Sequence, residues 1–402
     1  MKKNKILAIL TGGGDTPALN ASIEAIRNRA ISLGYNVYGI CKGWKGLLGD
    51  GEIVDLTHTP INGKFGGTII KSSRTNPFSG KDPNRVDQVI NNIKKYKIDV
   101  LVTIGGDDTN GAAKLLYEKI GIPVIGFPKT IDNDLRTKTY HIYNSEKIEA
   151  VLCPGFPTAA QTVAKLVNNL HTTAKSHART MVVEIMGRDA GWLTGAALFG
   201  NAHMFLIPEV PITKEKKKEF FEKVKKNLEK NKDKYLIIAV AEGVRWYDEK
   251  TDKVDVVYAS SETDEFGHPR FGGVSGVIAS EISKNLGIEA RSQILGYLAR
   301  SGNCSNYDFK LCNILADKLL ELLVNENYGK MTTLSEIVNY NELDYFKTSA
   351  IEMGNIGNIS LPLIYYSESD FTFNEKYYDF LSKFIEKPEN VLFDIELKKV
   401  II

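Results

Sequence analysis

The stretch "TIGGDDTNGAA" (Thr103–Ala113) places two adjacent aspartates after two glycines, at the end of the apolar run "DVLVTI" (Asp99–Ile104). A short apolar run that ends in a glycine turn and continues into a helix-like pattern is typical of a buried parallel strand leading into a helix. Glycines at such a turn let backbone N–H groups approach an anion, often a phosphate. One carboxylate beside a phosphate can hold a magnesium ion, but the second, Asp108, needs another explanation.

The same succession of strand, turn and helix recurs along the chain. Further apolar runs occupy residues 5–10, 122–127, 181–186, 203–208 and 235–243. Continuous apolar strands separated by helices indicate a mainly parallel sheet covered on both faces, which is an α/β fold. Ligands of such folds bind at the carboxyl ends of the strands, where the polar clusters of this sequence lie.

Composition sets limits on the function. The chain has 402 residues, a length that suggests two or three domains, and its net charge of +2 gives no reason to expect nucleic acid or a membrane as partner. Apolar runs stay well below the roughly 18 residues of a membrane span, and the run near the N-terminus is too short for a signal peptide. The four cysteines form no CxxC pair, so we expect reduced thiols in a cytoplasmic protein.

The first glycine cluster, "TGGGDTPALN" (Thr11–Asn20), follows the first apolar run. Its glycines can present N–H groups to a phosphate at a helix N-terminus, although glycine-rich turns also simply close corners between strands and helices. A dinucleotide site would require G-x-G-x-x-G, and Pro17 stands where the third glycine belongs. An oxidoreductase is therefore disfavoured.

The segment "PKTIDND" (Pro128–Asp134) carries a lysine, a threonine and two aspartates at one strand end. A local Asx turn would explain one aspartate but not the whole set. Phosphoryl transfer to an alcohol needs a base, a metal ion and cations that neutralise developing charge. Arginines near other glycine-rich segments suit phosphate oxygens, although each alone could be a surface residue: Arg74, Arg179, Arg188, Arg291 and Arg300. The six histidines, including His177, are assigned no role.

Seven motifs in fixed order resemble the 6-phosphofructokinase family, from about Lys5 to about Leu323. They are "GGGDTP", "GGTIIKSSR", "IGGDDT", "PKTIDND", "MGRDAGW", "AEG" and "LGYLARSG". The resemblance implies two Rossmann-like three-layer α/β domains with mainly parallel sheets. Residues 1–145 would bind the phosphate donor, completed by part of 300–350; residues 146–300 would bind the sugar phosphate; and residues 301–402 would form a helical segment and tail packing on both.

The resemblance also implies roles for single residues. Asp132 would accept the proton of the sugar 1-hydroxyl, and Asp107 would bind Mg²⁺. The residues expected to contact the donor or the transferred group are Gly14, Arg74, Asp108, Lys129, Thr130 and Asp134. Those expected to contact fructose 6-phosphate are Thr130, Ile131, Asp132, Met186, Gly187, Arg188, Glu242, Tyr297, Leu298, Ala299 and Arg300. Arg179 and Arg291 would reach in from a neighbouring subunit, which implies a homodimer or homotetramer with shared active sites.

Asp108 and Lys129 indicate the phosphate donor. Family members that use ATP typically have glycine in place of Asp108, and often in place of Lys129, whereas members that use inorganic diphosphate typically have aspartate and lysine. A carboxylate at position 108 would repel the α-phosphate of ATP and fill its space. We therefore expect a diphosphate-dependent enzyme that runs in both directions, with ATP as the alternative donor and a catalytically silent regulatory subunit as a more distant one.

Three features depart from the family pattern. Ala18 stands where glycine is common, and Ser301 stands where a second glycine is usual. The connection after "PKTIDND", Leu135 to Cys153, is about a dozen residues longer than in typical members. No basic set indicates an effector site, since only Arg27 and Arg29 fall in the first helix, so we assign no effector site from the sequence.

Overall fold

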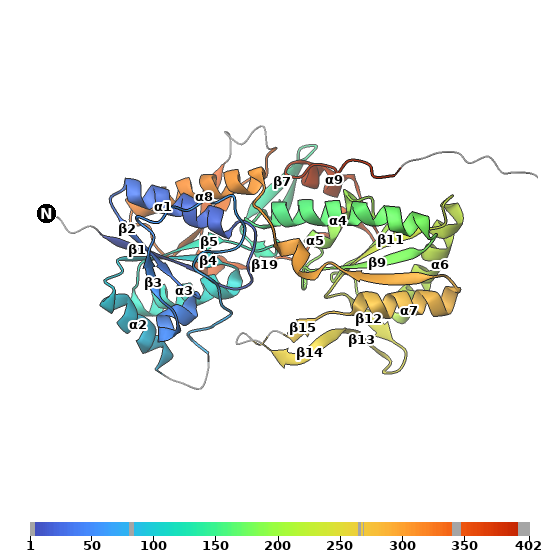
Figure 1. Ribbon diagram of the computed structural model, residues 1–402, viewed down its shortest axis with the longest axis horizontal. Coiled ribbons are helices and arrows are strands. Elements are labelled where there is room, and N and C mark those ends of the chain that lie inside the picture. Colours follow the sequence, from blue (N-terminus) through green and yellow to red (C-terminus); the bar gives the residue numbers. More distant parts are fainter. Residues whose placement is uncertain (1–4, 80–83, 264–266, 268, 340–346, 393–402) are drawn as a thin grey trace, which may run out of the picture.

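Two mainly parallel sheets, each covered by helices on both faces, form two lobes that lie side by side (Figure 1). The computed structural model describes residues 5–79, 84–263, 267, 269–339 and 347–392. The first four residues and two parts of the predicted C-terminal tail, 340–346 and 393–402, lie outside the described residues. The predicted α/β class with mainly parallel sheets is confirmed.

The first lobe contains a seven-stranded sheet in the order β18-β17-β5-β4-β1-β2-β3, parallel except for the outer strands β3 and β18. The strands are β1 (Ile6–Thr11), β2 (Asn36–Ile40), β3 (Ile53–Asp55), β4 (Val100–Gly105), β5 (Val124–Pro128), β17 (Lys330–Leu334) and β18 (Thr348–Glu352). Thr11 pairs with Ile104, and Gly105 pairs with Pro128. The carboxyl ends of β1, β4 and β5 are therefore neighbours, which places their three polar clusters together.

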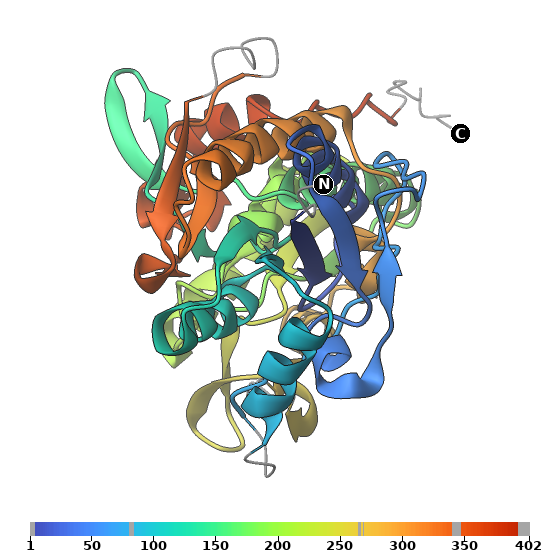
Figure 2. The ribbon, with the colours of Figure 1, turned by 90° about the vertical axis from the view of Figure 1, so that its left-hand side faces the viewer.

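Alternating side chains of the strands point to opposite faces of the sheet, and each set packs against a layer of helices. On β1, Leu7 and Ile9 join the core under one pair of helices, whereas Ile6 and Ala8 join the core on the opposite face. Figure 2 shows the first pair, α1 and α8, on one face and α2 and α3 on the other. These helices are α1 (Leu19–Ser32), α2 (Arg85–Lys95), α3 (Asp107–Ile120) and α8 (Asn306–Val324).

The second lobe repeats this plan with a parallel sheet in the order β10-β11-β9-β16. Its strands are β9 (Thr180–Ile185), β10 (Met204–Leu206), β11 (Leu236–Ala241) and β16 (Ala290–Ile294). Helix α4 (Phe156–Ser176) covers one face, and α6 (Lys214–Lys230) and α7 (Val274–Leu286) cover the other. Both β10 and β16 are edge strands.

The lysine- and glutamate-rich stretch after Thr213 forms α6. The Thr213 hydroxyl caps the start of this helix by accepting a hydrogen bond from the Lys216 backbone N–H. Phe220, Val224 and Leu228 are buried on one face, as an amphipathic surface helix requires. Lys217 is buried as well, and its Nζ forms an ion pair with Glu281 at 2.6 Å, which compensates the burial of its charge.

The long connection after "PKTIDND" and the C-terminal tail, for which the sequence predicted no specific contacts, pack on each other. The long connection contains the hairpin β7 (Thr139–Tyr143) and β8 (Glu146–Ala150), and the tail contains α9 (Glu375–Ser382). The buried His141 of the hairpin bonds through Nδ1 to the Tyr365 hydroxyl (2.9 Å) and through Nε2 to Asp379 (2.7 Å). Several aromatic residues of the tail are core residues, among them Tyr365, Phe373, Tyr377 and Phe380.

Short elements complete the described chain. They are β6 (Leu135–Arg136), β12 (Arg245–Asp248), β13 (Lys253–Val256), β14 (Tyr258–Thr263), β15 (Pro269–Phe271), β19 (Gly357–Asn358), β20 (Tyr366–Ser367), β21 (Thr372–Phe373), α5 (Trp192–Gly195) and the helical turns η1 (Gly46–Asp50), η2 (Ala196–Leu198), η3 (Gly296–Arg300), η5 (Met353–Asn355) and η6 (Leu363–Tyr365).

Candidate active site

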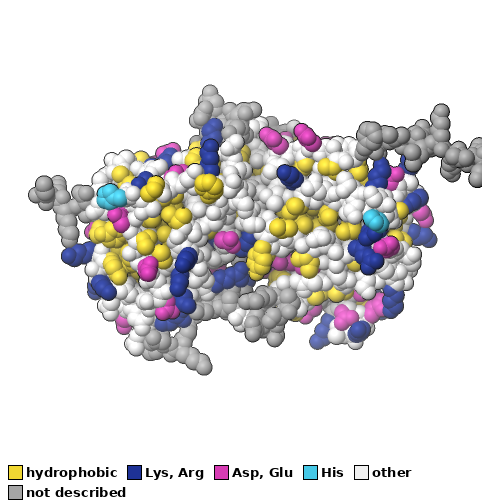
Figure 3. All heavy atoms as spheres, in the orientation of Figure 1, with side chains coloured by type: hydrophobic (Ala, Val, Ile, Leu, Met, Phe, Trp, Pro, Cys, Tyr) yellow, Lys and Arg dark blue, Asp and Glu magenta, His cyan; other side chains and the backbone are white. Residues whose placement is uncertain are grey.

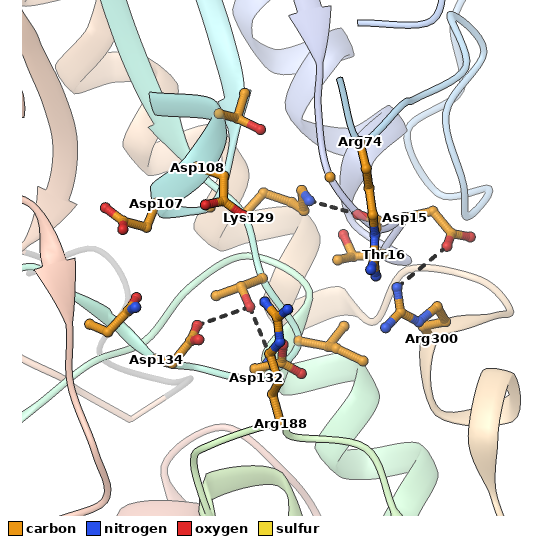
Figure 4. Close-up of a pocket in the computed structure, with 17 residues that line it drawn as sticks. Asp15, Thr16, Arg74, Asp107, Asp108, Lys129, Asp132, Asp134, Arg188 and Arg300 are labelled. Atoms are coloured by element: carbon orange, nitrogen blue, oxygen red, sulfur yellow. Dashed lines mark hydrogen bonds and ion pairs between the residues drawn. The ribbon is translucent and has the colours of Figure 1, made fainter. Parts of the chain in front are cut away.

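A pocket lies where the carboxyl ends of β1, β4 and β5 meet the second lobe (Figure 4). Eleven of the predicted site residues line it: Gly14, Arg74, Asp107, Asp108, Lys129, Thr130, Ile131, Asp132, Asp134, Arg188 and Arg300. Six further residues line it as well: Gly13, Asp15, Thr16, Gly106, Thr109 and Asn358. All of these except Asn358 belong to the quoted glycine motifs, whose positions at strand ends could have identified them.

The glycine loop after β1 forms one wall. Gly13 has φ +80°, a conformation that favours glycine. At Gly14, a Cβ atom would collide with a guanidinium nitrogen of Arg300. The Arg300 guanidinium also lies 3.8 Å from Asp15. Glycine at position 14 therefore leaves room for a cationic side chain from the second lobe to approach the loop.

The two aspartates of the opening stretch occupy the first turn of α3. Carboxylates are favourable at a helix N-terminus, because the helix dipole and free N–H groups there carry positive partial charge. Burial, followed by the repulsion from Asp108, raises the pKa of Asp107. A bound cation would offset both effects, so this carboxylate suits a metal ligand.

Lys129 supplies a buried cation at the centre of the pocket. Its Nζ donates a hydrogen bond to the Gly14 carbonyl oxygen at 2.6 Å. Burial and then the nearby Arg300 lower the pKa of Lys129 to about 8, so the ammonium form still dominates at pH 7. A buried ammonium with one carbonyl partner retains two N–H donors for an anionic ligand.

The loop that follows β5 is held by its own threonine and by a distant segment. The Thr130 hydroxyl accepts a hydrogen bond from the Asp132 backbone N–H (3.0 Å) and donates one to Asp134 (3.3 Å). Asn133 has φ +55°, and its side chain bonds to Val151 and Cys153 rather than to the local turn. The local turn proposed as the alternative thus accounts for Thr130 and Asp134, while Asn133 anchors the loop to the connection.

Two acids, one in this loop and one beside it, have raised pKa values. Burial and then the repulsion from Asp132 raise the pKa of Asp134 to about 7. The same two causes, in the same order, raise the pKa of Glu242 to about 7. Glu242 also accepts the Arg188 backbone N–H at 3.3 Å. Perturbed carboxylates clustered in a cleft with arginines are typical of a functional site.

Some predicted sugar-side residues adjoin the pocket without lining it. The Met186 sulfur accepts a hydrogen bond from the Arg300 guanidinium (3.4 Å), and Gly187 and Glu242 flank Arg188. Ala299 is buried, whereas Tyr297 and Leu298 are 77% and 55% exposed. Arg179 and Arg291 both pair with Glu289, at 3.8 and 3.1 Å, and lie outside the pocket.

The five aspartates that line the pocket are oxygen donors of the kind that Mg²⁺ prefers. Among the described residues, no group of three or more His, Cys, Asp or Glu side chains is arranged to hold a metal ion. Mg²⁺ sites in phosphoryl-transfer enzymes commonly use one or two carboxylates together with substrate phosphates and water. The residues present fit such an ion.

Glycine loops, arginines, a buried lysine and paired carboxylates at the strand ends of a two-lobed α/β protein define a class of phosphoryl-transfer enzymes. The family model described as Phosphofructokinase matches residues 6–323, and the chain belongs to this family. The resemblance seen in the sequence is thus confirmed. No helix of the described residues is long and apolar enough to cross a membrane.

Individual relatives cover most of the chain. A protein of Dictyoglomus thermophilum named pyrophosphate–fructose 6-phosphate 1-phosphotransferase is 39% identical over 92% of this chain and 99% of its own. A protein of Clostridium perfringens named ATP-dependent 6-phosphofructokinase 2 is 37% identical over 86% of this chain and 92% of its own. The crystal structure of a pyrophosphate-dependent phosphofructokinase from Marinobacter aquaeolei matches with a TM-score of 0.74, covering 99% of this chain and 100% of that one. Its identity is 20%, so it bears on the fold alone.

Proposed function

We propose that the protein phosphorylates fructose 6-phosphate at its 1-hydroxyl with inorganic diphosphate, giving fructose 1,6-bisphosphate and orthophosphate. The observation that carries this proposal is that Asp108 and Lys129 line the same pocket as the glycine loop. Asp108 would repel the α-phosphate of ATP, whereas diphosphate has no such group. Four relatives at 36–39% identity are named as diphosphate-dependent enzymes, in support of this donor.

In the proposed reaction, each of these pocket residues has a separate role. Asp132 takes the proton of the 1-hydroxyl, whose oxygen forms a bond to the terminal phosphorus of diphosphate while the bridging P–O bond breaks. Lys129 and Arg74 neutralise the charge that moves onto the leaving orthophosphate. Asp107 would hold Mg²⁺, which when bound screens the charge of the phosphate oxygens.

Sugar binding in this proposal uses both chains of an oligomer. Arg188, Glu242 and Arg300 hold fructose 6-phosphate from within the chain, and Arg179 and Arg291 of a second copy complete the phosphate site. The location of both arginines outside the pocket supports this arrangement, as does Arg291 on the edge strand β16. Ile294, Tyr297 and Leu298 are 52–77% exposed close by, and Figure 3 shows exposed hydrophobic side chains on both lobes and at their junction.

Donor preference tests the proposal directly. Purified protein is supplied with fructose 6-phosphate, Mg²⁺ and either diphosphate or ATP, and kcat/KM is measured for each donor. We expect diphosphate to be preferred, and fructose 1,6-bisphosphate with orthophosphate to regenerate diphosphate, because the two phosphoryl donors are of comparable potential. A higher kcat/KM with ATP would reject diphosphate as the donor, and no turnover with either would favour a silent subunit.

A further inference from the structure

The segment after β18 crosses from the first lobe to the second beside the pocket. The Met353 N–H donates to the Gly329 carbonyl (2.9 Å) in the first lobe. The Leu361 N–H donates to Glu209 (2.8 Å), whose same oxygen accepts the Gly191 N–H from the second lobe. Figure 1 shows β19, in the middle of this segment, where the two lobes meet.

Between these two anchors, β19 is fixed against the loop that carries the predicted base. It pairs antiparallel with β6, so that Asn358 lies opposite Leu135. The next residue, Ile359, donates its N–H to the Asp134 carbonyl oxygen at 2.7 Å. The position of Asn358 relative to "PKTIDND" is therefore set by backbone hydrogen bonds on both sides.

The Asn358 side chain is available to a ligand. It is exposed and lines the same pocket as Asp107, Asp108 and Asp134. Within the described part of the chain, no hydrogen bond occupies its amide group, which offers two N–H donors and one acceptor. A neutral amide can donate to an anion here without adding a further negative charge to the three carboxylates.

We propose that Asn358 is a donor-binding residue whose side-chain NH₂ hydrogen-bonds a phosphate oxygen of diphosphate. The inference rests on the proposed function, because it takes diphosphate as the ligand of this pocket. The C-terminal segment would then contribute directly to the donor site and not only to the fold.

The test measures binding of diphosphate in the presence of Mg²⁺ by calorimetry, with fructose 6-phosphate binding measured in parallel. Loss of one charge-assisted hydrogen bond in Asn358→Ala should weaken diphosphate binding about tenfold. Asn358→Asp should weaken it more, because the carboxylate repels the ligand. Binding of fructose 6-phosphate should change less than about twofold.

Asn355 provides the matched control. It lies three residues earlier, is exposed and does not line the pocket, so Asn355→Ala and Asn355→Asp should bind diphosphate as the wild type does. Unchanged diphosphate binding in Asn358→Ala would overturn the inference. Tighter binding in Asn358→Asp would also overturn it, since the residue would then act on the cation.

The two proposals can fail separately. If the wild type binds ATP and not diphosphate, the proposed function fails, and the same variants are measured with ATP and Mg²⁺. Weaker ATP binding confined to the Asn358 variants would then still place Asn358 in the donor site. Equal ATP binding by all variants would reject Asn358 as a donor-binding residue.

Discussion

The donor side and the sugar side of the site are built differently. On the donor side, Gly14, Arg74, Asp107, Asp108 and Lys129 all line one pocket within a single chain. Of the four arginines predicted for the sugar side, only Arg188 and Arg300 line it, whereas Arg179 and Arg291 pair with Glu289 outside the pocket. Under the proposed function, we expect one chain to bind the donor by itself but to need a neighbour to grip the sugar phosphate.

Removing the predicted base should have the largest effect. Asp132→Asn preserves size and hydrogen bonding but cannot accept the proton, so kcat should fall about 10² to 10⁴-fold with little change in sugar binding. Steady-state kinetics and calorimetry measure the two quantities. Asp189→Asn, at an exposed aspartate outside the pocket, is the control. Nearly full turnover in Asp132→Asn would mean that this aspartate serves only the turn.

Shared sites can be tested by mixing subunits. Loss of one charge-assisted phosphate contact in Arg179→Ala or Arg291→Ala should lower kcat/KM for fructose 6-phosphate about 10 to 10²-fold. Mixing Arg179→Ala with Asp132→Asn should restore part of the activity, since some sites then receive both intact halves. Mixing the two arginine variants should restore little if both arginines enter the same site from the same neighbour.

Subunit exchange must be demonstrated for this experiment, for example with differently tagged chains. Arg245→Ala, at an exposed arginine of β12, controls for loss of positive charge. Absence of rescue despite exchange would mean that the sugar side is complete within one chain, and the comparison between the two sides would fail.

The donor side itself can be altered at Asp108. Asp108→Gly removes both the charge and the volume proposed to exclude ATP, so the ratio of kcat/KM for ATP to that for diphosphate should rise about tenfold or more. Asp108→Asn retains the volume and removes the charge, and its ratio separates the two causes. An unchanged ratio in both variants would show that Asp108 does not select the donor.

The sequence predicted that the residues of the proposed donor side lie together, because they belong to local motifs at strand ends. Gly14, Asp107 and Lys129 follow three apolar strands, and the pairing of those strands brings their ends together. Each motif is recognisable without knowledge of any distant contact. The α/β class follows from the same strands, whose continuous apolar pattern reflects burial on both faces.

Contacts between distant segments could not be predicted in this way. Asn358 reaches the pocket through a two-residue strand paired with β6, and so short a pairing leaves no periodic pattern in the sequence. The bond of His141 to Asp379 joins residues 238 positions apart. Both depend on how the long connection and the tail pack together, which is a tertiary property.

The smallest expected effect concerns the junction between the two sides, where Asp134 is half-buried. Its folded-state pKa of about 7 lies above the unfolded value near 3.8, so between about pH 4 and 7 the folded protein keeps a proton that the unfolded chain releases. The contribution of Asp134 to the free energy of unfolding is therefore fully present below pH 4 and is lost as the pH rises through 7.

Asp134→Asn should reduce the fall in the free energy of unfolding between pH 5 and pH 7.5 by on the order of 1 kcal/mol, measured by urea unfolding. Asp317→Asn, at an exposed carboxylate of α8, should leave the fall as in the wild type. Equal falls in wild type and Asp134→Asn would mean that Asp134 is ionised throughout this range, so that Asp132 and Asp134 both bring negative charge to the junction.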